Sequence, residues 1–421
     1  MRRSRTPGPN PSKGEIHLQK PEILSPAGDM ERLENAVLYG ADAVYLGGTA
    51  FGMRAACANF DREGLRSAVE YAHERNVRVY LTCNTLPSNE ELEQLPDFLR
   101  MARDAGVDAL IVADIGILML AKRLVPELEL HISTQAGVVN YLTAIELHRL
   151  GAKRVVLARE LSLEEIRCIR EHTPADLEIE VFVHGAMCMS FSGRCLLSNY
   201  IVGRDANRGE CAQPCRWGYH LMEEKRPGQY YPIFEDEKGS YILNAKDLCM
   251  IEYIDQLTEA GVTSLKIEGR AKSAYYVAVV TGAYRAAVDA YLRDPLHYHP
   301  PQWVLDEVLR VSHREYSTGF YFGRPDQCYQ NAGYIRNWDV IAVVEGWEDG
   351  ELLVTGRNKF SRGEEAEIMR PGHPPEKFII TAIHDPQTGE VESACHPMRQ
   401  YRIPCAKPFL RGAMLRREIK P

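Results

Sequence analysis

Short apolar segments alternate with amphipathic stretches along residues 21–292, and this alternation dominates the hydrophobic pattern of the chain. The apolar segments have the length of buried strands, whereas the stretches between them repeat apolar residues at helical spacing. Eight strands are predicted, at 22–28, 43–48, 78–85, 109–114, 130–136, 154–160, 178–185 and 264–269. Strand and helix repeated in this order indicate an α/β fold with a parallel sheet.

Several predicted helices end in a glycine and a small residue just before the next strand. Glycine supplies the left-handed backbone that terminates a helix, and the small neighbour lets the chain turn into a buried strand. The pairs are Gly40-Ala41, Gly106-Val107, Gly151-Ala152 and Gly261-Val262. Their repetition favours a closed (β/α)8 barrel over an open doubly wound sheet, and no glycine-rich dinucleotide fingerprint follows the first strand.

The chain divides into three regions. Its 421 residues exceed one barrel of about 250 residues, so a second domain is expected. We predict a basic flexible arm over 1–20, a TIM-like (β/α)8 catalytic domain over 21–334, and a small β-barrel domain over 335–421, where short strands and turns replace the helices. The unit between strands seven and eight is abnormally long, which predicts an insertion over 185–263.

Composition narrows the class of protein. Hydrophobic residues make up 45% and charged residues 26%, as in soluble globular proteins. The basic start of the chain is not followed by the apolar stretch of a signal peptide, so we expect a cytoplasmic protein without a membrane partner. In that compartment the 11 cysteines are expected to be core residues or metal ligands, not disulfides.

Charge is unevenly distributed. The formal net charge of -8 argues against a surface that is basic throughout. Both chain ends are nevertheless basic, and residues 399–421 carry seven basic residues against one acid. These ends are either solvated tails or contacts for nucleic-acid phosphates, with Arg204, Arg208 and Arg216 of the insertion as the alternative phosphate contacts.

Four cysteines gather in the first half of the insertion, with a C-x6-C-x15-C-x3-C spacing. They are Cys188, Cys195, Cys211 and Cys215. Four thiolates suit zinc or an iron-sulfur cluster, and the lack of tight C-x2-C knuckles favours iron-sulfur. The remaining cysteines are expected to be unligated, although Cys249 could substitute as a ligand if it does not pack at the start of a helix.

Long segments are recognisable beyond these cysteines. They include ILSPAGDMERLENAVLYGADAVYLGG, EVFVHGAMCMSFSGRCLLS, GRDANRGECAQPCRW, SLKIEGRAKSAYYV and NKFSRGEEAEI. The chain resembles, over nearly its whole length, the collagenase-like peptidase family thirty-two of the unknown-mechanism class. Within that family it is most similar to the prephenate-dependent tRNA uridine hydroxylases, which carry a β-rich carboxyl-terminal domain.

This resemblance implies a specific activity. It implies 5-hydroxylation of the wobble uridine of tRNA without molecular oxygen, a [4Fe-4S] cluster on the four cysteines, prephenate as co-substrate, and an electron donor as a further partner. Hydroxylation of another RNA or of a quinone precursor is the alternative, and a collagenase-like peptidase is the second. The peptidase is disfavoured because neither H-E-x-x-H nor G-x-S-x-G occurs, and a Cys188–His184 pair would compete with cluster ligation.

Polar residues at the ends of barrel strands point into the mouth of the barrel, where such enzymes carry their sites. We predict His184, Glu268 and Arg159 as catalytic residues. The predicted substrate-binding residues are Arg54, Asn84, Gln135, Arg159, Arg194, Arg270 and Tyr275.

Each prediction has a competing structural role. The arginine forks suit the carboxylates of prephenate, but Arg159 or Arg270 could instead pair with Glu268. His184 could transfer a proton or hydrogen-bond the loop that carries Cys188. Tyr275 could stack on a base or simply pack.

Overall fold

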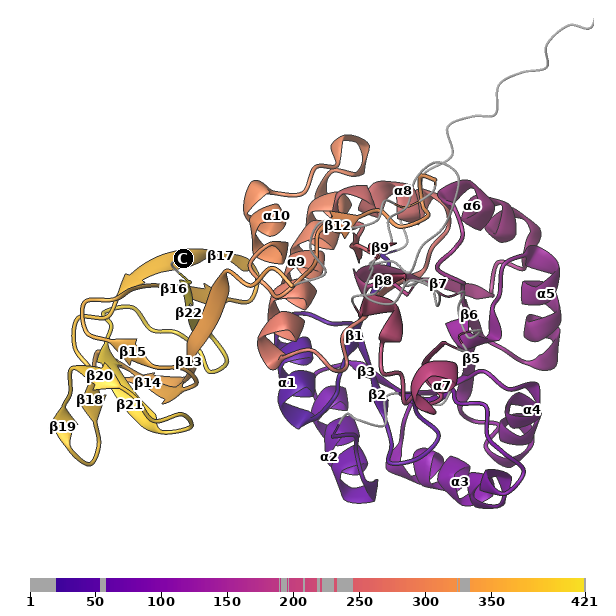
Figure 1. Ribbon diagram of the computed structural model, residues 1–421, viewed down its shortest axis with the longest axis horizontal. Coiled ribbons are helices and arrows are strands. Elements are labelled where there is room, and N and C mark those ends of the chain that lie inside the picture. Colours follow the sequence, from indigo (N-terminus) through magenta and orange to yellow (C-terminus); the bar gives the residue numbers. More distant parts are fainter. Residues whose placement is uncertain are drawn as a thin grey trace, which may run out of the picture.

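A parallel ring of strands forms the centre of the molecule (Figure 1). The computed structural model describes residues 20–53, 58–188, 190, 195, 197–206, 209–217, 220–221, 231–232, 245–323, 325 and 334–419. The ring consists of β1 (Glu22–Pro26), β2 (Ala43–Gly47), β3 (Arg78–Cys83), β4 (Ala109–Val112), β5 (Glu129–Ile132), β6 (Arg154–Val156), β7 (Glu178–Ala186) and β11 (Ser264–Ile267). Strands β1 to β7 pair in chain order, and β11 closes the ring against β7 and β1. The predicted TIM-like barrel and its eight strands are confirmed.

Helices surround this ring (Figure 1). They are α1 (Met30–Leu38), α2 (Arg62–His73), α3 (Leu95–Ala105), α4 (Ile115–Leu124), α5 (Tyr141–Leu150), α6 (Leu163–His172), α8 (Ile254–Glu259), α9 (Ala274–Arg293) and α10 (Gln302–Val308). Local sequence sets their ends, since Asp29 caps α1 and Ser162 forms a capping box with Glu165 on α6. The four predicted helix-ending glycines all have positive φ, between 81° and 115°.

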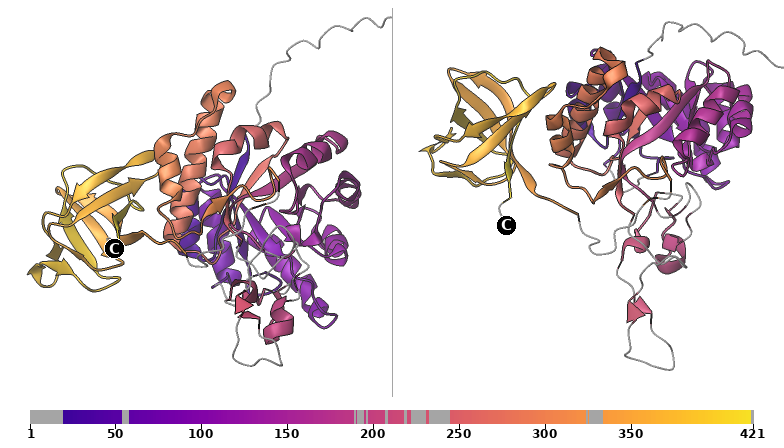
Figure 2. Two further views of the ribbon diagram at one scale, coloured as in Figure 1. Left: turned by 45° about the horizontal axis from the view of Figure 1, so that its top comes forward. Right: turned by 90° about the horizontal axis from the view of Figure 1, so that it is seen from above.

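The unit between β7 and β11 departs from the repeat. It contains α7 (Leu197–Val202) and the hairpin β8 (His220–Leu221) and β9 (Tyr231–Pro232), which lie to one side of the barrel (Figure 2). It returns through β10 (Asp247–Cys249), which pairs antiparallel with the end of β7. Cys249 therefore lies in a strand, not at the start of a helix as expected.

The second domain is antiparallel. Its sheet has the order β17-β16-β22-β13-β14-β21-β18-β19, with β15 and β20 forming a separate pair. The bounds are β13 (Trp338–Glu348), β14 (Glu351–Gly356), β15 (Phe360–Ser361), β16 (Glu365–Arg370), β17 (His373–Ile379), β18 (His384–Asp385), β19 (Gly389–Glu390), β20 (Ser393–Ala394), β21 (Gln400–Pro404) and β22 (Met414–Glu418). In the described residues, the expected small β-barrel is thus a sheet whose strand order has two ends.

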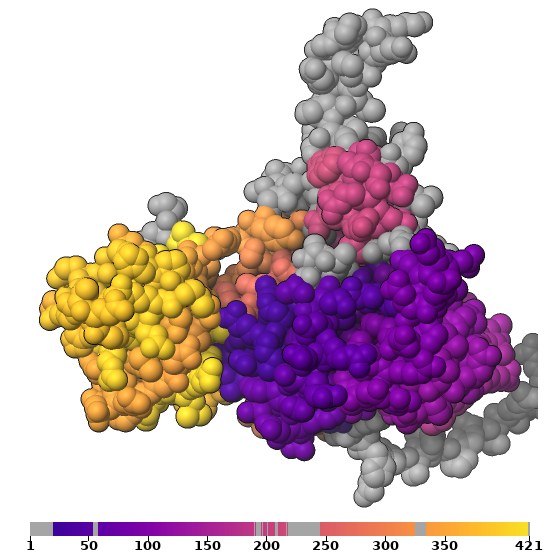
Figure 3. Space-filling view, turned by 90° about the horizontal axis from the view of Figure 1, so that it is seen from below, coloured from indigo at the N-terminus to yellow at the C-terminus, as the bar shows by residue number. Residues whose placement is uncertain are grey.

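The two domains are joined by a buried ionic contact. Arg416 of β22 is fully buried and donates to Glu307 of α10, with 2.8 Å from Nη1 to Oε2. Glu367 of β16 accepts from both Arg416 and Arg310. The hydroxyl of Tyr39 also donates to the carbonyl of Gly412, and the domains abut in the space-filling view (Figure 3).

Candidate functional site

A cavity that is partly open to solvent lies at the carboxyl ends of the barrel strands. It is lined by Tyr45, Met53, Thr82, Asn84, Ile111, Ser133, Thr134, Gln135, Val156, Arg159, Phe182, Lys266, Glu268 and Arg270. Five residues predicted from the sequence are among them, namely Asn84, Gln135, Arg159, Glu268 and Arg270. This is the location at which barrel enzymes bind their substrates.

Arg159 forms one wall of the cavity. Its Nη2 donates to Glu268 Oε2 at 2.8 Å, and its Nη1 donates to the carbonyl of Ala186 at 2.8 Å. The guanidinium carbon lies 3.6 Å from the centroid of the Phe182 ring. The predicted alternative of a salt bridge with Glu268 is therefore present, and Arg159 also ties the cavity to the loop that begins after β7.

Arg270 is buried and hydrogen-bonded to the protein, whereas an arginine that binds substrate was expected. It is 3% exposed, and it donates to Thr82 Oγ1 at 2.9 Å and to the carbonyl of Met53 at 2.8 Å. A weaker bond reaches Asn59 Oδ1 at 3.3 Å. Arg270 thus fastens the chain after β2 to β3, and its fork is largely occupied by the protein.

Two amide side chains also line the cavity. Asn84 accepts from the backbone N–H of Met53 at 3.2 Å and donates to Ser133 Oγ at 3.3 Å. Gln135 lies in the 3-10 turn Thr134–Ala136 that follows β5. Amide side chains both donate and accept hydrogen bonds, so this wall can pair with the edge of a nucleobase.

Sequence reasoning missed Lys266, which lies on the cavity floor. It is 4% exposed, and its Nζ donates to Glu180 Oε1 at 2.6 Å. The alternation of side chains along the strand could have predicted this position, because Lys266 lies two residues before Glu268 and therefore on the same, inward face.

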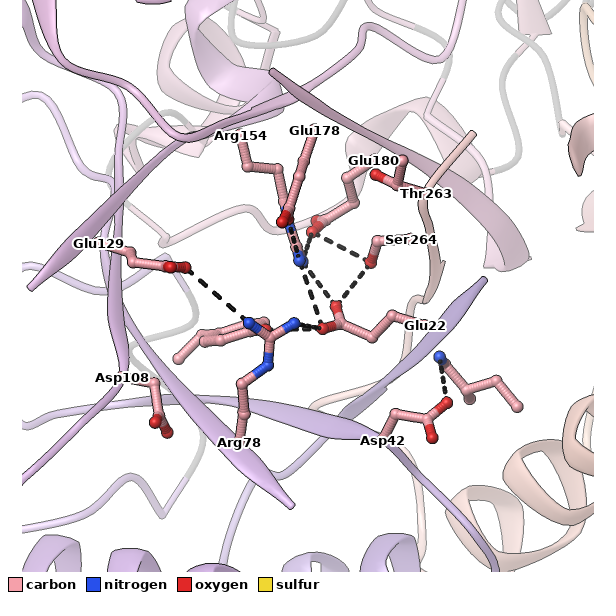
Figure 4. Close-up of polar contacts among 12 residues, drawn as sticks. Glu22, Asp42, Arg78, Asp108, Glu129, Arg154, Glu178, Glu180, Thr263 and Ser264 are labelled. Atoms are coloured by element: carbon pink, nitrogen blue, oxygen red, sulfur yellow. Dashed lines mark hydrogen bonds and ion pairs between the residues drawn. The ribbon is translucent and has the colours of Figure 1, made fainter. Parts of the chain in front are cut away.

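Below Lys266 lies a layer of buried charges inside the barrel (Figure 4). Arg154 donates to Glu22 at 2.6 Å, to Glu178 at 2.5 Å and to Glu180 at 3.0 Å. Burial alone would raise the pKa of Glu180, but Lys266 and Arg154 outweigh it and lower that pKa. The floor of the cavity is consequently a hydrogen-bonded network in which the charged form of Glu180 is favoured.

His184 does not line the cavity. The pairing of β7 with β11 shifts by one residue, so that Ile267 lies opposite His184; in a regular ladder it would lie opposite Val183. Such a bulge turns the side chains that follow it to the other face of the sheet. The ring packs instead against Tyr276, Tyr284 and Tyr316. Burial lowers the pKa of His184 to about 3, so the predicted proton-transfer role does not fit this environment.

Tyr275 is also placed away from the cavity. It begins α9, where its hydroxyl donates to the carbonyl of Arg310 at 3.0 Å and accepts from Arg416. It therefore packs at the contact between the domains and is not placed to stack on a base in the mouth. Arg54, Arg194 and Arg208 lie outside the described residues, as do residues 1–19 of the predicted arm.

The cysteine loop starts two residues after Ala186, to which Arg159 is bonded. Burial raises the pKa of the Cys188 thiol, Arg159 opposes this, and the neighbouring thiols of Cys195 and Cys211 add to the increase. Cys195 and Cys215 are half-buried, and the backbone N–H of Gln213 donates to Cys211 Sγ at 3.3 Å. In the part of the chain that the structure describes, no three such side chains stand at metal-ligand spacing. The donor set itself, four thiols around one loop, fits an iron-sulfur cluster.

The basic carboxyl-terminal segment is neutralised by the fold. Its described basic residues all form ion pairs: Arg399 with Asp385, Arg402 with Glu348, Lys407 with Glu376, Arg411 with Glu345, Arg416 with Glu307 and Arg417 with Glu364. The predicted phosphate contact at residues 399–421 is therefore not supported for Arg416 or Arg417. The local count of charges could not show that acids from other strands lie beside them.

Known proteins resemble the whole chain. Residues 28–331 match the model of peptidase family U32, and residues 336–416 match the model of its C-terminal domain. tRNA hydroxylation protein P1 of Bacillus subtilis (strain 168) is 37% identical, over 96% of each chain, and tRNA hydroxylation protein P of Escherichia coli (strain K12) is 39% identical, over 84% of this chain and 86% of the relative. An uncharacterized protease of Methanocaldococcus jannaschii is 47% identical, over 84% of this chain and 91% of the relative.

Two further observations complete the comparison. The match to the U32 C-terminal model coincides with the antiparallel domain, and the match to the main U32 model spans the barrel with its insertion. Among the described helices, none has the length and apolar character needed to cross a bilayer. With both family models matched along this one chain, the protein belongs to peptidase family U32.

Proposed function

We propose that this protein is an RNA-modifying enzyme that hydroxylates position 5 of the wobble uridine in tRNA. The reaction depends on prephenate, uses an iron-sulfur cluster and does not draw on molecular oxygen. Relatives that align over most of both chains are named for tRNA hydroxylation, which supports the substrate class. The cavity at the barrel mouth is lined by polar side chains that could bind a small organic molecule or a single extruded base.

The observation that carries the proposal is the position of Arg159. This residue lines the cavity and is bonded through Glu268 to one wall, while its other N–H group holds the carbonyl of Ala186. Its charge also acts on the Cys188 thiol. A residue that contacts both the substrate cavity and the cysteine loop couples a redox group to the reacting base.

Cys188, Cys195, Cys211 and Cys215 would hold a [4Fe-4S] cluster, which supplies electron transfer when bound. The chain itself contributes binding and orientation. Glu268 presents a carboxylate to the cavity for proton transfer, and Arg159 holds that carboxylate in place. Asn84 and Gln135 provide the amide groups that would read the base edge.

The peptidase that the family name suggests receives no support from the geometry. A thiol peptidase needs a histidine beside its cysteine. None of the interactions within the described residues joins His184 to Cys188, and His184 is packed among tyrosines outside the cavity.

The arginines of the insertion are the proposed contacts for the RNA phosphates. Because the basic residues of the carboxyl-terminal segment are paired, Arg204, Arg208 and Arg216 become the expected phosphate contacts. The variant Arg204→Ala should weaken tRNA binding at low salt and flatten its salt dependence. Arg411→Ala, which removes an exposed arginine of the second domain, is the matched control and should change neither property.

Anaerobic purification combined with tRNA analysis tests the proposal. The protein should be brown with about four irons per chain, and Cys188→Ala, Cys195→Ala, Cys211→Ala and Cys215→Ala should each lose the colour. Cys395→Ala, an exposed cysteine of the second domain, should keep it. Nucleoside mass spectrometry should find less 5-hydroxyuridine in tRNA from a deletion strain, restored by wild type but not by the cluster variants. Stoichiometric zinc, or unchanged hydroxyuridine, would contradict the proposal.

A further inference from the structure

We propose that Lys266 binds an anion in the cavity and that it receives a carboxylate of the small co-substrate. This inference rests on the proposed function, because it assigns the residue that binds the carboxylate co-substrate of the hydroxylation. Lys266 comes from β11 and lies on the cavity floor.

The ammonium of Lys266 has donors to offer. An ammonium carries three N–H groups, and within the described residues Lys266 makes a single hydrogen bond, to Glu180. Glu180 is shared, since it also accepts from Arg154 at 3.0 Å, and Glu22 and Glu178 accept from Arg154 as well. A buried ammonium with unsatisfied donors is costly unless a ligand or water accepts from it. The cavity is the place from which such an acceptor can come.

The ammonium of Lys266 lies beside two aromatic rings. Its Nζ lies 4.6 Å from the centroid of the Tyr45 ring and 5.5 Å from that of Phe182. Arg159 lies over the same Phe182 ring, at 3.6 Å. The ammonium of Lys266 and the guanidinium of Arg159 therefore both lie near Phe182, and all three residues line the cavity.

Arg270 is held by the protein through more bonds than Lys266. Its terminal nitrogens donate to Thr82 at 2.9 Å, to the carbonyl of Met53 at 2.8 Å and to Asn59 at 3.3 Å. Its guanidinium also lies so close to Gly47 that a Cβ there would stand 2.6 Å from Nη1. Arg270 thus shapes the wall by holding the chain after β2, whereas Lys266 remains directed at the cavity.

The experiment measures prephenate binding to the anaerobically purified holoprotein by isothermal titration calorimetry. Lys266→Met removes the charge and retains the length of the side chain, and it should weaken prephenate binding about thirtyfold. The double variant Glu180→Gln/Lys266→Met removes both members of the buried pair, so it avoids an unpaired carboxylate. Lys122→Met, on the outer helix α4, removes the same charge far from the cavity and should bind as wild type does.

The outcomes separate this inference from the proposed function. Loss of prephenate binding in both Lys266 variants, with tRNA affinity and unfolding midpoint retained in the double variant, supports the inference. Wild-type affinity in either folded variant overturns it and leaves the proposed function standing. If wild-type protein itself binds no prephenate while it still hydroxylates tRNA, the prephenate dependence fails and the inference fails with it.

Discussion

The variant Glu22→Gln tests whether the buried charges beneath the cavity stabilise the barrel. Glu22 is 8% exposed and accepts from Arg154 at 2.6 Å, from Tyr80 at 2.7 Å and from Ser264 at 2.9 Å. Burial by itself would raise the pKa of Glu22, but Arg154 and Arg78 outweigh burial and lower it to about 2, from 4.5.

The pH dependence follows from that shift. The unfolded state binds the proton of Glu22 more readily than the folded state, so the stabilisation is complete well above pH 4.5 and is lost as pH falls toward 2. A shift of this size corresponds to about 3 kcal/mol at pH 7 and to about 2 kcal/mol at pH 3.5. Glutamine resembles the protonated acid, so Glu22→Gln should lower the free energy of unfolding by about these amounts at the two pH values.

Urea unfolding of the holoprotein, followed by circular dichroism at pH 7 and pH 3.5, measures both values. Glu146→Gln is the matched control, because Glu146 forms an exposed pair with Arg149 and its loss should cause no measurable change. A difference between wild type and Glu22→Gln that is the same at both pH values would refute the electrostatic reasoning. Such a result would attribute the loss to altered hydrogen bonding of the amide.

Three more results are expected. Arg416→Met should lower the unfolding free energy by about 3 kcal/mol, because Glu307 stays buried and keeps only Arg310 as its cation, and adding Glu307→Gln should recover most of the loss in the same urea assay. Since the pKa of His184 is about 3 in the folded protein and 6.5 is its ordinary value, the folded state should lose stability as pH falls below about 6.5; His184→Gln should reduce that loss between pH 7.5 and pH 5. Arg159→Lys should slow tRNA hydroxylation at least about tenfold with its iron content unchanged, since the compact ammonium lacks the planar fork that reaches both Glu268 and Ala186; a wild-type rate would remove Arg159 from the site.

Local sequence signals were sufficient for the barrel and for much of the cavity. The periodicity of strands and helices and the helix-ending glycines can be read from neighbouring residues. Once a strand is placed, its alternation gives the direction of side chains at its end, such as Asn84 and Glu268. The position of His184 was predicted wrongly because a bulge turns its side chain away from the cavity, and a bulge is not visible in the hydrophobic pattern. The pairing of Arg416 with Glu307 escaped because 109 residues separate the two in sequence.

The antiparallel pairing of β7 with β10 determines where the segment between them can be replaced without disturbing the barrel. Ala186 lies opposite Asp247, so the segment between them leaves and re-enters the barrel at one place. For a loop whose ends are already together, added length costs little, since the closure entropy grows only with the logarithm of the number of residues. The segment can therefore be exchanged as a unit, and a short turn in its place should leave a folded barrel in which the cavity is studied without Cys188, Cys195, Cys211 and Cys215.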